Sequence, residues 1–280
     1  MAVSNPLAGT RRGRTLYTGA DIRARVNWYG AGTAMDRHEH EAHQVSLLLA
    51  GTLQERTPRG EVRLDGPAIG IKPAGQAHDN DYGPRGALIL CVELGPDVDL
   101  GAATGHGMSW HWQSRLSGAL VAGSRKLLAD LVEDSDADVE GRVWEWLAMA
   151  REGDGQPRGS RPGWVQRACT RLREDDTASL SRISRDEGLH PVYFSRAFAR
   201  WVGCPPTVFR LRARLERAFE ALALGCTLAE AAFQAGFADQ SHFTRVARAH
   251  SGPSPRQWRR ILARPRVQSV QDAGGGAGEH

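Results

Sequence analysis

The stretch GLHPVYFSRAFARWVGCPPTVFR (residues 188–210) returns, with changes, as GFADQSHFTRVARAHSGPSPRQWR (residues 236–259). A shift of 49 positions places Arg196 on Arg245, whereas the opening glycines align at a shift of 48. The turn in the second copy is therefore one residue longer. A self-match at a fixed spacing is typical of a duplicated supersecondary unit. A helix, a turn that contains glycine and a second helix make a helix-turn-helix, so the sequence predicts two such modules.

The residue pattern of the first copy predicts where its helices begin and end. Ser179 is a suitable N-cap for a short helix, and Gly188 ends that helix in a left-handed turn. Pro191 suits the first position of the next helix, where its missing N–H costs nothing. Phe194 and Phe198 follow four residues apart, which gives the helix a buried stripe. The second copy repeats this pattern.

The second helix of each copy carries polar side chains on the face opposite its buried stripe. Such side chains near the N-terminal end of a helix are what the reading of base edges in a DNA major groove requires. One helix over residues 207–224 joins the modules, and we expect it to present both reading helices on one side of the protein. The predicted DNA-contacting residues are Val192, Ser195, Arg196 and Arg200 in the first copy, and Gln240, Ser241, His242, Thr244 and Arg245 in the second.

These motifs make residues 164–263 resemble the DNA-binding domain of the AraC/XylS family of bacterial transcription regulators. Two positions depart from the family pattern: Ala247 stands where the family has an aromatic, and His190 stands at a cap that is usually Ser. At Ala247 two outcomes are open: the second module packs more loosely, or Trp258 fills the gap. The resemblance implies a cytoplasmic protein that binds double-stranded promoter DNA and contacts RNA polymerase. Its role as an activator, rather than a repressor, is the family's usual one and stays open.

Charge agrees with this interpretation. The 280 residues include 36 basic and 32 acidic side chains, for a net charge of +4. Residues 163–266 hold 18 arginines, no lysine and nine acidic residues, so the positive charge is concentrated in the predicted modules. Such a concentration is expected of a surface that contacts phosphates. A merely solvated helix face is the plainer alternative, but it does not explain why the charge coincides with the motif.

Several protein classes are not expected. No apolar run reaches the ~18–20 residues of a membrane span, and the N-terminal segment lacks the apolar stretch of a secretory signal. We therefore expect no membrane partner. The four cysteines are scattered without a CxxC pair, which indicates reduced, packed thiols rather than a structural zinc site.

The N-terminal part reads as β structure. Ile22, Ala24, Val26 and Trp28 alternate with polar residues, which predicts a half-buried strand. Further short apolar runs, separated by Gly, Pro and Asp, favour a sandwich or a small barrel. The expected fold class is α+β multidomain, with a β-barrel and a helical hairpin followed by an all-α pair of helix-turn-helix modules.

Two short motifs in this part resemble the cupin signatures. Gly32, His38, His40, Gln44 and Gly51 have the spacing of the first signature, with Gln44 where metal-binding cupins often have Glu. The segment GIKPAGQAHDN, which contains His78, resembles the second. Relatives of the arabinose regulator often carry such a barrel as an effector-sensing domain. The resemblance therefore implies a cupin-like sensing domain that binds a small-molecule effector.

The histidines have two interpretations. His38 and His40 are two apart on a predicted strand and point the same way, so with His78 they are candidate ligands for a divalent metal such as zinc or iron. Alternatively, the three histidines and Gln44 line an organic effector pocket without a metal, the reading we favour, because the barrel is the only sizeable concave site that we expect. No cofactor is certain on either reading. His43 and residues 79–81 read as loop polarity rather than as ligands.

Two roles are open for the predicted helical hairpin. Its apolar stripes can pack on the barrel of the same chain, or, as the family resemblance implies, form the contact of a homodimer. We expect a loose basic tail over residues 1–15, the sensing domain over 16–111, the hairpin over 112–151, a Gly/Pro-rich flexible linker over 152–163, the DNA-binding domain over 164–266 and a disordered tail over 267–280.

The sequence therefore predicts a sequence-specific DNA-binding transcription regulator with a sensing barrel, and not an enzyme. One rival is a metal-dependent cupin enzyme, such as an oxygenase, fused to a DNA-binding domain. Gln44 in place of an acidic ligand and the lack of a further catalytic constellation speak against it. The other rival is a constitutive DNA-binding protein whose barrel binds nothing.

Overall fold

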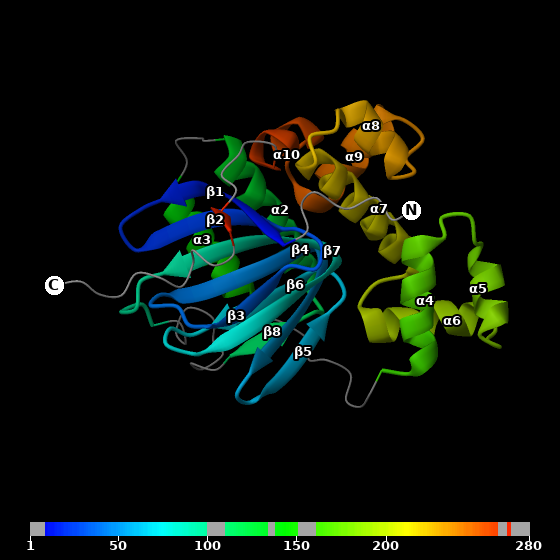
Figure 1. Cartoon of the computed structure of the whole chain (residues 1–280), viewed down its shortest axis with the longest axis horizontal. Coiled ribbons are helices and arrows are strands. Elements are labelled where there is room, and N and C mark those ends of the chain that lie inside the picture. Colours follow the sequence, from blue (N-terminus) through cyan, green and yellow to red (C-terminus); the bar gives the residue numbers. More distant parts are fainter. Residues whose placement is uncertain (1–8, 100–109, 134–137, 151–160, 263–267, 270–280) are drawn as a thin grey trace.

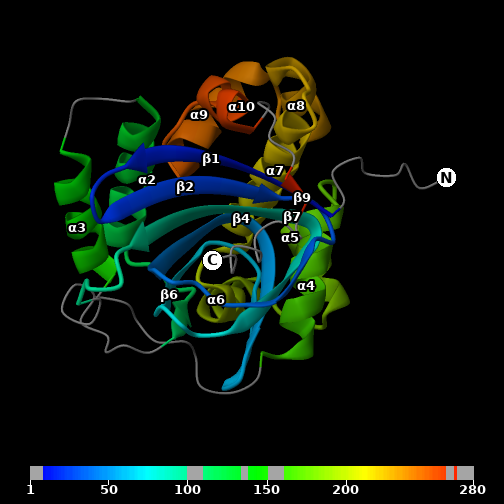
Figure 2. The ribbon, with the colours of Figure 1, turned by 60° about the vertical axis from the view of Figure 1, so that its left-hand side comes forward.

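An antiparallel sheet that curls into a barrel makes up the N-terminal domain (Figures 1 and 2). The computed structural model describes residues 9–99, 110–133, 138–150, 161–262 and 268–269. Its strands run in the order β8-β6-β4-β7-β2-β1-β9, while β3 pairs with β7 and β5 pairs with β4. The strands are β1 (Thr10–Thr18), β2 (Ile22–Tyr29), β3 (Ala34–His38), β4 (His43–Thr57), β5 (Gly60–Leu64), β6 (Ala68–Lys72), β7 (His78–Leu94), β8 (His111–Gln113) and β9 (Gln268–Ser269).

Helices follow the sheet in two groups. The hairpin consists of α2 (Gly118–Glu133) and α3 (Val139–Met149). The C-terminal helices are α4 (Gly163–Glu174), α5 (Leu180–Asp186), α6 (Pro191–Val202), α7 (Pro206–Ala223), α8 (Leu228–Gln234), α9 (Gln240–Ser251) and α10 (Pro255–Leu262). In the described part of the chain, no helix combines the length and the apolar character that a bilayer span requires.

The central strands are buried on both faces, which the sequence did not indicate. Ile22, Ala24, Val26 and Trp28 of β2 pack in a cluster with the helices, on the outer face of the sheet. Tyr29 belongs to a different cluster, inside the barrel. The prediction of a half-buried strand therefore holds only at the start of β2, where Arg23 is exposed. Arg25 and Asn27 line the barrel cavity instead of facing solvent, and helices cover the outer face.

Strand β1 corrects the expected N-terminal tail. Residues 10–15 are not loose, because β1 pairs antiparallel with β2 and places Arg11 opposite Tyr29 and Arg12 opposite Trp28. The pairing supplies backbone partners to an edge of β2 that would otherwise be open. Gln268 and Ser269, expected to be disordered, pair with the other edge of β1; the other residues of that tail and residues 152–160 of the expected linker lie outside the described residues.

Two further expectations about loops are corrected. Residues 79–81 are part of the long strand β7, where Asp79 and Asp81 form ion pairs with Arg56 at 2.6 and 2.7 Å. His43 is a buried residue of β4 whose ring contacts the backbone of Pro96 and Ala74. Backbone groups, rather than a ligand, thus provide the hydrogen-bond partners of the buried His43 ring.

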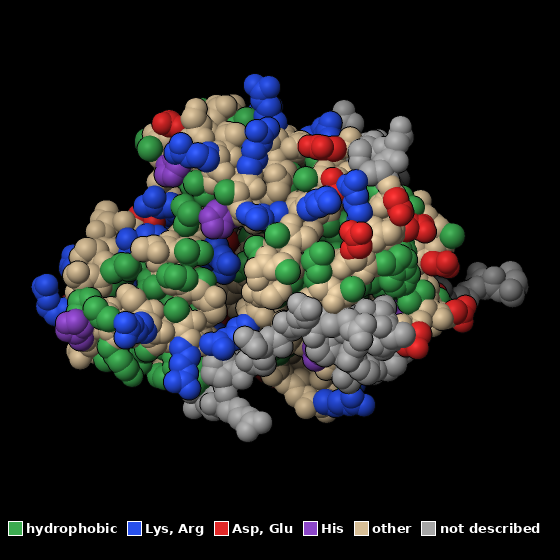
Figure 3. Space-filling view, turned by 180° about the vertical axis from the view of Figure 1, so that it is seen from behind, with side chains coloured by type: hydrophobic (Ala, Val, Ile, Leu, Met, Phe, Trp, Pro, Cys, Tyr) green, Lys and Arg blue, Asp and Glu red, His purple; other side chains and the backbone are tan. Residues whose placement is uncertain are grey.

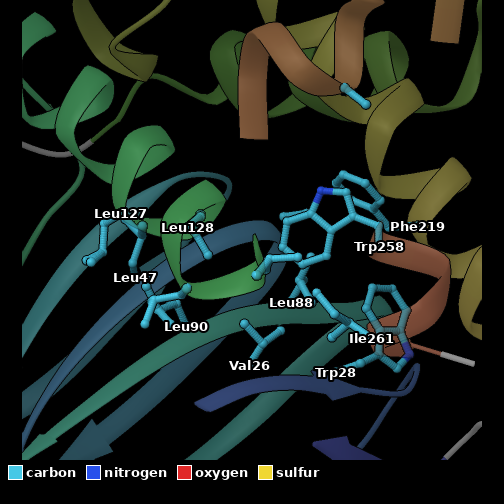
Figure 4. Close-up of a cluster of buried hydrophobic side chains, with 14 of the residues drawn as sticks. Val26, Trp28, Leu47, Leu88, Leu90, Leu127, Leu128, Phe219, Trp258 and Ile261 are labelled. Carbon is cyan, nitrogen blue, oxygen red and sulfur yellow. The ribbon is translucent and has the colours of Figure 1, made fainter. Parts of the chain in front are cut away.

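The α2–α3 hairpin packs on the barrel of its own chain. Leu127 and Leu128 of α2 lie against Leu47 and Leu90 of the sheet in one buried cluster, which also includes Trp258 of α10 (Figure 4). The first of the two roles proposed for the hairpin is therefore present in the structure. A dimer contact through its outer face stays a prediction.

The two helix-turn-helix modules have the local structure that the sequence predicts. Ser179 caps α5 by accepting from the N–H of Arg182, and His190 caps α6 by accepting from the N–H of Val192 at 3.4 Å. Gly188 and Gly236 occupy the turns with φ of +68° and +78°. In this left-handed region glycine pays no steric penalty. The α5–α6 pair is called the first module below, and the α8–α9 pair the second module.

Trp258 stabilises the second module near Ala247. The indole is fully buried and stacks near Phe219, with ring centroids 5.3 Å apart. Its Nε1 donates to Ser251 at 2.8 Å, and the Ser251 hydroxyl donates to the carbonyl of Ala247 at 2.7 Å. Trp258 is thus linked to the backbone of Ala247 through Ser251, and both residues belong to one buried cluster.

Candidate functional site

The second helix of each module presents the predicted DNA-contacting residues. Phe194 and Phe198 of α6, and Phe243 of α9, are fully buried, which turns the opposite faces outward. The predicted residues of those faces are exposed or half-buried: Val192, Ser195, Arg196 and Arg200 on α6, and Gln240, Ser241, His242, Thr244 and Arg245 on α9. Asp239 caps α9 by accepting from the N–H of His242 at 2.7 Å, so the reading end of that helix is fixed.

One residue of this surface was missed. Tyr193, in the first turn of α6, is 58% exposed. The shift of 49 that relates the two copies places it on His242, which was among the predicted contacts. If each predicted contact of one copy had been carried over to the equivalent position of the other, Tyr193 would have been identified.

The C-terminal ends of both reading helices dock on the N-terminal domain at equivalent points. Arg115 donates to the carbonyl of Arg200 in α6, and Arg125 of α2 donates to the carbonyl of Ala249 in α9. Arg200 and Ala249 are related by the same shift of 49. A guanidinium at the C-terminal end of a helix also complements the helix dipole. Each module is therefore held at its far end, while its N-terminal reading end stays open.

Basic side chains gather on the module side of the molecule. Seen from behind, Lys and Arg side chains are spread over the helix-turn-helix modules, and acidic ones gather on the opposite side (Figure 3). Arg182, Arg185 and Arg248 add exposed positive charge beside the reading helices. This distribution suits contacts with DNA phosphates.

The barrel encloses a polar cavity of about 320 Å³. His38 ends β3, His40 lies just beyond that strand, and His78 begins β7, so the two-apart spacing on one strand was a wrong premise. The three rings nevertheless converge, with centroids 4.2 to 5.2 Å apart. Gln44 lines the same cavity. The four predicted pocket residues are thus together in space.

His40 and His78 are neutral at physiological pH. Burial, and to a smaller extent the charges of His38 and Lys72, lowers the pKa of His40 to about 4. Burial, followed by the charge of Lys72, lowers the pKa of His78 to about 2. Neutral imidazole is the form that binds metal and that accepts hydrogen bonds from a ligand.

The donor set fits a metal ion. One ring nitrogen from each histidine lies within 4.8 Å of the others, and Nε2 of His78 is buried without a hydrogen-bond partner. Gln44 offers only an amide oxygen, which already accepts from Ser46 at 3.1 Å. Lys72 also lines the cavity, and its charge opposes a bound cation.

A buried ion pair closes one wall of the cavity. Lys72 lies 2.6 Å from Glu55, and both side chains are almost fully buried. Glu55 also accepts from the indoles of Trp110, at 2.7 Å, and Trp112. A buried carboxylate needs this degree of pairing, because an unpaired charge in the interior is very costly.

A second cavity, of about 230 Å³, lies between the domains and was not expected. Its walls come from β4, α2, α7 and α9 and include Leu48, Leu128, Leu215, Phe219 and Arg212. The expectation that the barrel holds the only sizeable concave site is therefore wrong. Such a site needs contact between segments that are far apart in sequence, which no local motif encodes.

Residues 183–261 match the protein family described as "Helix-turn-helix domain". The C-terminal part of this chain is an AraC-type helix-turn-helix domain. No curated protein matches the chain.

Solved structures are similar to parts of the chain. ToxT from Vibrio cholerae is 10% identical with a TM-score of 0.36, over 87% of this chain and 99% of its own. The C-terminal domain of AraT, a response regulator from Geobacillus stearothermophilus, is 26% identical with a TM-score of 0.34, over 36% and 88%. A cupin superfamily protein from Desulfitobacterium hafniense is 14% identical with a TM-score of 0.30, over 31% and 80%.

The AraC-type domain contacts the barrel through arginines. Arg12 of β1 donates to the carbonyls of Ala223, at the end of α7, and of Leu262, at the end of α10. Arg161 lies 2.6 Å from Asp65, in the turn between β5 and β6. The barrel and the AraC-type domain are thus packed against each other.

The cavity also contains polar residues that the motifs did not indicate. Arg25, Asn27 and Tyr29 of β2 and Arg11 of β1 line it together with the histidines. Asn80, in the segment read as loop polarity, lines it as well. The alternation of polar and apolar residues in β2 could have indicated its cavity-lining residues, but its polar side chains were predicted to face solvent.

Proposed function

We propose that this protein is a sequence-specific DNA-binding transcription regulator whose barrel cavity binds a small-molecule effector. DNA binding is supported by the AraC-type domain and by the exposed faces of α6 and α9. The observation that carries effector sensing is the behaviour of two adjacent residues in β1. Arg11 lines the cavity, while Arg12 contacts the AraC-type domain.

This arrangement gives the signal a short route. Neighbouring residues of a strand point to opposite faces, so one strand borders both the ligand site and the DNA-binding domain. A ligand that shifts β1 at Arg11 changes the contact of Arg12 with the ends of α7 and α10. The carbonyls of those helix ends depend on such partners. Coupling through docked surfaces is therefore favoured over coupling through the linker.

The proposal is tested by DNA binding of the full chain. Selection from a random duplex library is expected to give a consensus with two half-sites. A metabolite screen by thermal shift then finds the effector, since a ligand of the native state raises Tm. Arg12→Ala is expected to keep effector binding but to lose the effector's influence on DNA affinity, whereas Arg14→Ala, on the same strand, keeps both. If the effector still changed the DNA affinity of Arg12→Ala, the proposed route through β1 would be contradicted.

A second candidate function is a metal-dependent enzyme in the barrel, which the converging histidines favour. His38, His40 and His78 would hold the metal, which would supply Lewis-acid or redox chemistry. Metal analysis of the purified full chain separates the two candidates. Stoichiometric metal that His78→Ala removes, together with a metal-dependent turnover, supports the enzyme. Metal-free protein that still responds to an effector supports the regulator.

Two further partners belong to the proposal. Promoter regulation requires contact with RNA polymerase, and the outer face of the α2–α3 hairpin is available for a homodimer contact. Trp144 of α3 is exposed on that hairpin. Sedimentation of the full chain and of Trp144→Ser tests whether this face joins two copies.

A further inference from the structure

We infer that the effector is a small organic carboxylate, held by the guanidinium groups of Arg11 and Arg25 in the barrel cavity. This inference rests on the proposed function and names the chemical class of its ligand. It begins from the cations that line the cavity: Arg11, Arg25 and Lys72. Lys72 is already paired with Glu55, at 2.6 Å, so its ammonium group is less available to a bound anion than the two guanidinium groups.

The two arginines have no carboxylate partner among the described residues. Arg11 donates to the amide oxygen of Asn27 at 3.2 Å and lies over the ring of Tyr29, 5.6 Å from its centroid. Nε of Arg25 is buried without any hydrogen-bond partner. Glu93, the acidic residue in the cavity lining, forms its ion pair with Arg23 and acts on Arg11 only at longer range.

Both guanidinium groups border the same wall. Arg25 and Asn27 are two residues apart on one face of β2, and Arg11 reaches Asn27 from β1. Gly13 lies opposite Asn27 in the pairing, and a Cβ there would come within 2.4 Å of the Asn27 amide oxygen. The absent side chain therefore keeps this wall open for the contact from Arg11.

An unpaired guanidinium in an enclosed site is costly unless an anion joins it. Guanidinium groups match the planar geometry of a carboxylate, with two parallel hydrogen bonds. The cavity of about 320 Å³ is at the lower end of small-ligand pockets, so it suits a small molecule. Inorganic phosphate would leave most of it unfilled. The organic body would lie toward the three histidines and the stacked rings of Tyr29 and Tyr82.

Stability without ligand gives a first test. Because Arg25 is half-buried with its Nε left without a hydrogen-bond partner, Arg25→Gln is expected to raise the Tm of the ligand-free full chain, or to leave it unchanged. A residue that holds the barrel together would lower it. The matched control is Arg14→Gln, which removes an exposed guanidinium from β1 and is expected to change nothing. A clear loss of Tm in Arg25→Gln alone would overturn the inference.

Ligand binding gives the second test, by calorimetry and thermal shift on the full chain. The probes are small mono- and dicarboxylates, their neutral amides, neutral sugars and inorganic phosphate. A carboxylate is expected to bind, and its neutral amide is expected not to bind. Arg11→Gln and Arg25→Gln are each expected to raise the Kd of the carboxylate at least about ten-fold. Arg14→Gln keeps the wild-type Kd.

The outcomes separate this inference from the proposed function. A neutral sugar or amide that binds while every acid fails would overturn the carboxylate and leave effector sensing intact. Phosphate that binds as tightly as the acids would also overturn it. If no compound of any class shifts Tm, both the carboxylate and the sensing role fail, while DNA binding stands on its own measurement.

Discussion

At the scale of single residues, the exposed face of α6 is expected to separate base reading from phosphate contact. Arg196 lies in the middle of the helix, one turn nearer its N-terminal end than Arg200, and both are exposed. In a helix that enters the major groove by its N-terminal end, the first of these reaches base edges and the second stays near the backbone. The two arginines therefore have different predicted roles.

Substitution of these two arginines tests that division. Arg196→Ala is expected to lose about 1–3 kcal/mol of binding free energy and to relax the preference at particular base pairs. Arg200→Ala is expected to weaken all sequences alike and to reduce the salt slope by about 1. Binding to a panel of single-base operator variants, at several salt concentrations, measures both. Unchanged sequence preference in Arg196→Ala would show that the assigned face is wrong.

Gly252 tests the docking of the second module. It has a φ of +89°, and a Cβ there would lie 2.3 Å from the carbonyl oxygen of Arg125. Gly252→Ala is expected to lower the free energy of unfolding by more than Gly188→Ala, which has a similar φ but open space around it. The control should cost about 1–2 kcal/mol, from left-handed strain alone. Denaturant unfolding of both variants measures the difference; equal losses would contradict docking at this point.

At the scale of elements, the capping box of α8 fixes the start of the second module. The hydroxyl of Thr227 accepts from the N–H of Glu230 at 3.2 Å, and the Glu230 carboxylate accepts from the N–H of Thr227 at 2.8 Å. The Thr227 N–H and, at 2.8 Å, the Thr227 hydroxyl both donate to the Glu230 carboxylate, and these bonds lower the pKa of Glu230. Two backbone donors that have no partner within the helix are satisfied in this way.

Removal of the cap is expected to loosen α8. Thr227→Ala should cost about 1 kcal/mol of stability, since its hydroxyl satisfies a backbone donor of the first turn. Thr207→Ala is the matched control, because Thr207 is exposed near the start of α7, whose N-cap residue makes no side-chain hydrogen bond. Thermal unfolding, with hydrogen exchange of the α8 amides, should show loss only for Thr227→Ala. Equal behaviour of the two variants would mean that α8 is held by packing alone.

The helix-turn-helix elements could be predicted from the sequence because their determinants are local. Ser179, Gly188 and Pro191 act on the backbone within a few residues of themselves. The spacing of Phe194 and Phe198 then defines the buried face. Because the copy at residues 236–259 repeats these determinants, each module supported the prediction of the other.

The barrel elements were less predictable because their faces are decided at a distance. TRRGR at residues 10–14 reads as a basic tail until β2 is present to pair with it. Arg25 and Asn27 read as solvent-facing until α2 and α10 cover the other side of the sheet. The histidines converge because β3 and β7 are paired, although they are far apart in sequence.

At the scale of the whole molecule, the barrel and the two modules form one packed body. Arg115 and Arg125 hold equivalent carbonyls of the two reading helices, and Arg12 holds the ends of α7 and α10. We expect a change in the barrel to alter the position of both modules through these contacts. Packed interfaces of this kind move between discrete arrangements rather than deforming continuously.

The rigid helix α7 joins the two modules. The central proposal is that one chain reads two successive major grooves. The reading helices are expected to lie about one DNA turn, or about 34 Å, apart on the same side of the protein. Hydroxyl-radical footprinting of the full chain on its selected operator tests this most directly. For each bound chain, we expect two protected patches on one face of the duplex, one turn apart. A single protected groove per chain, or protection that does not depend on sequence, would contradict it.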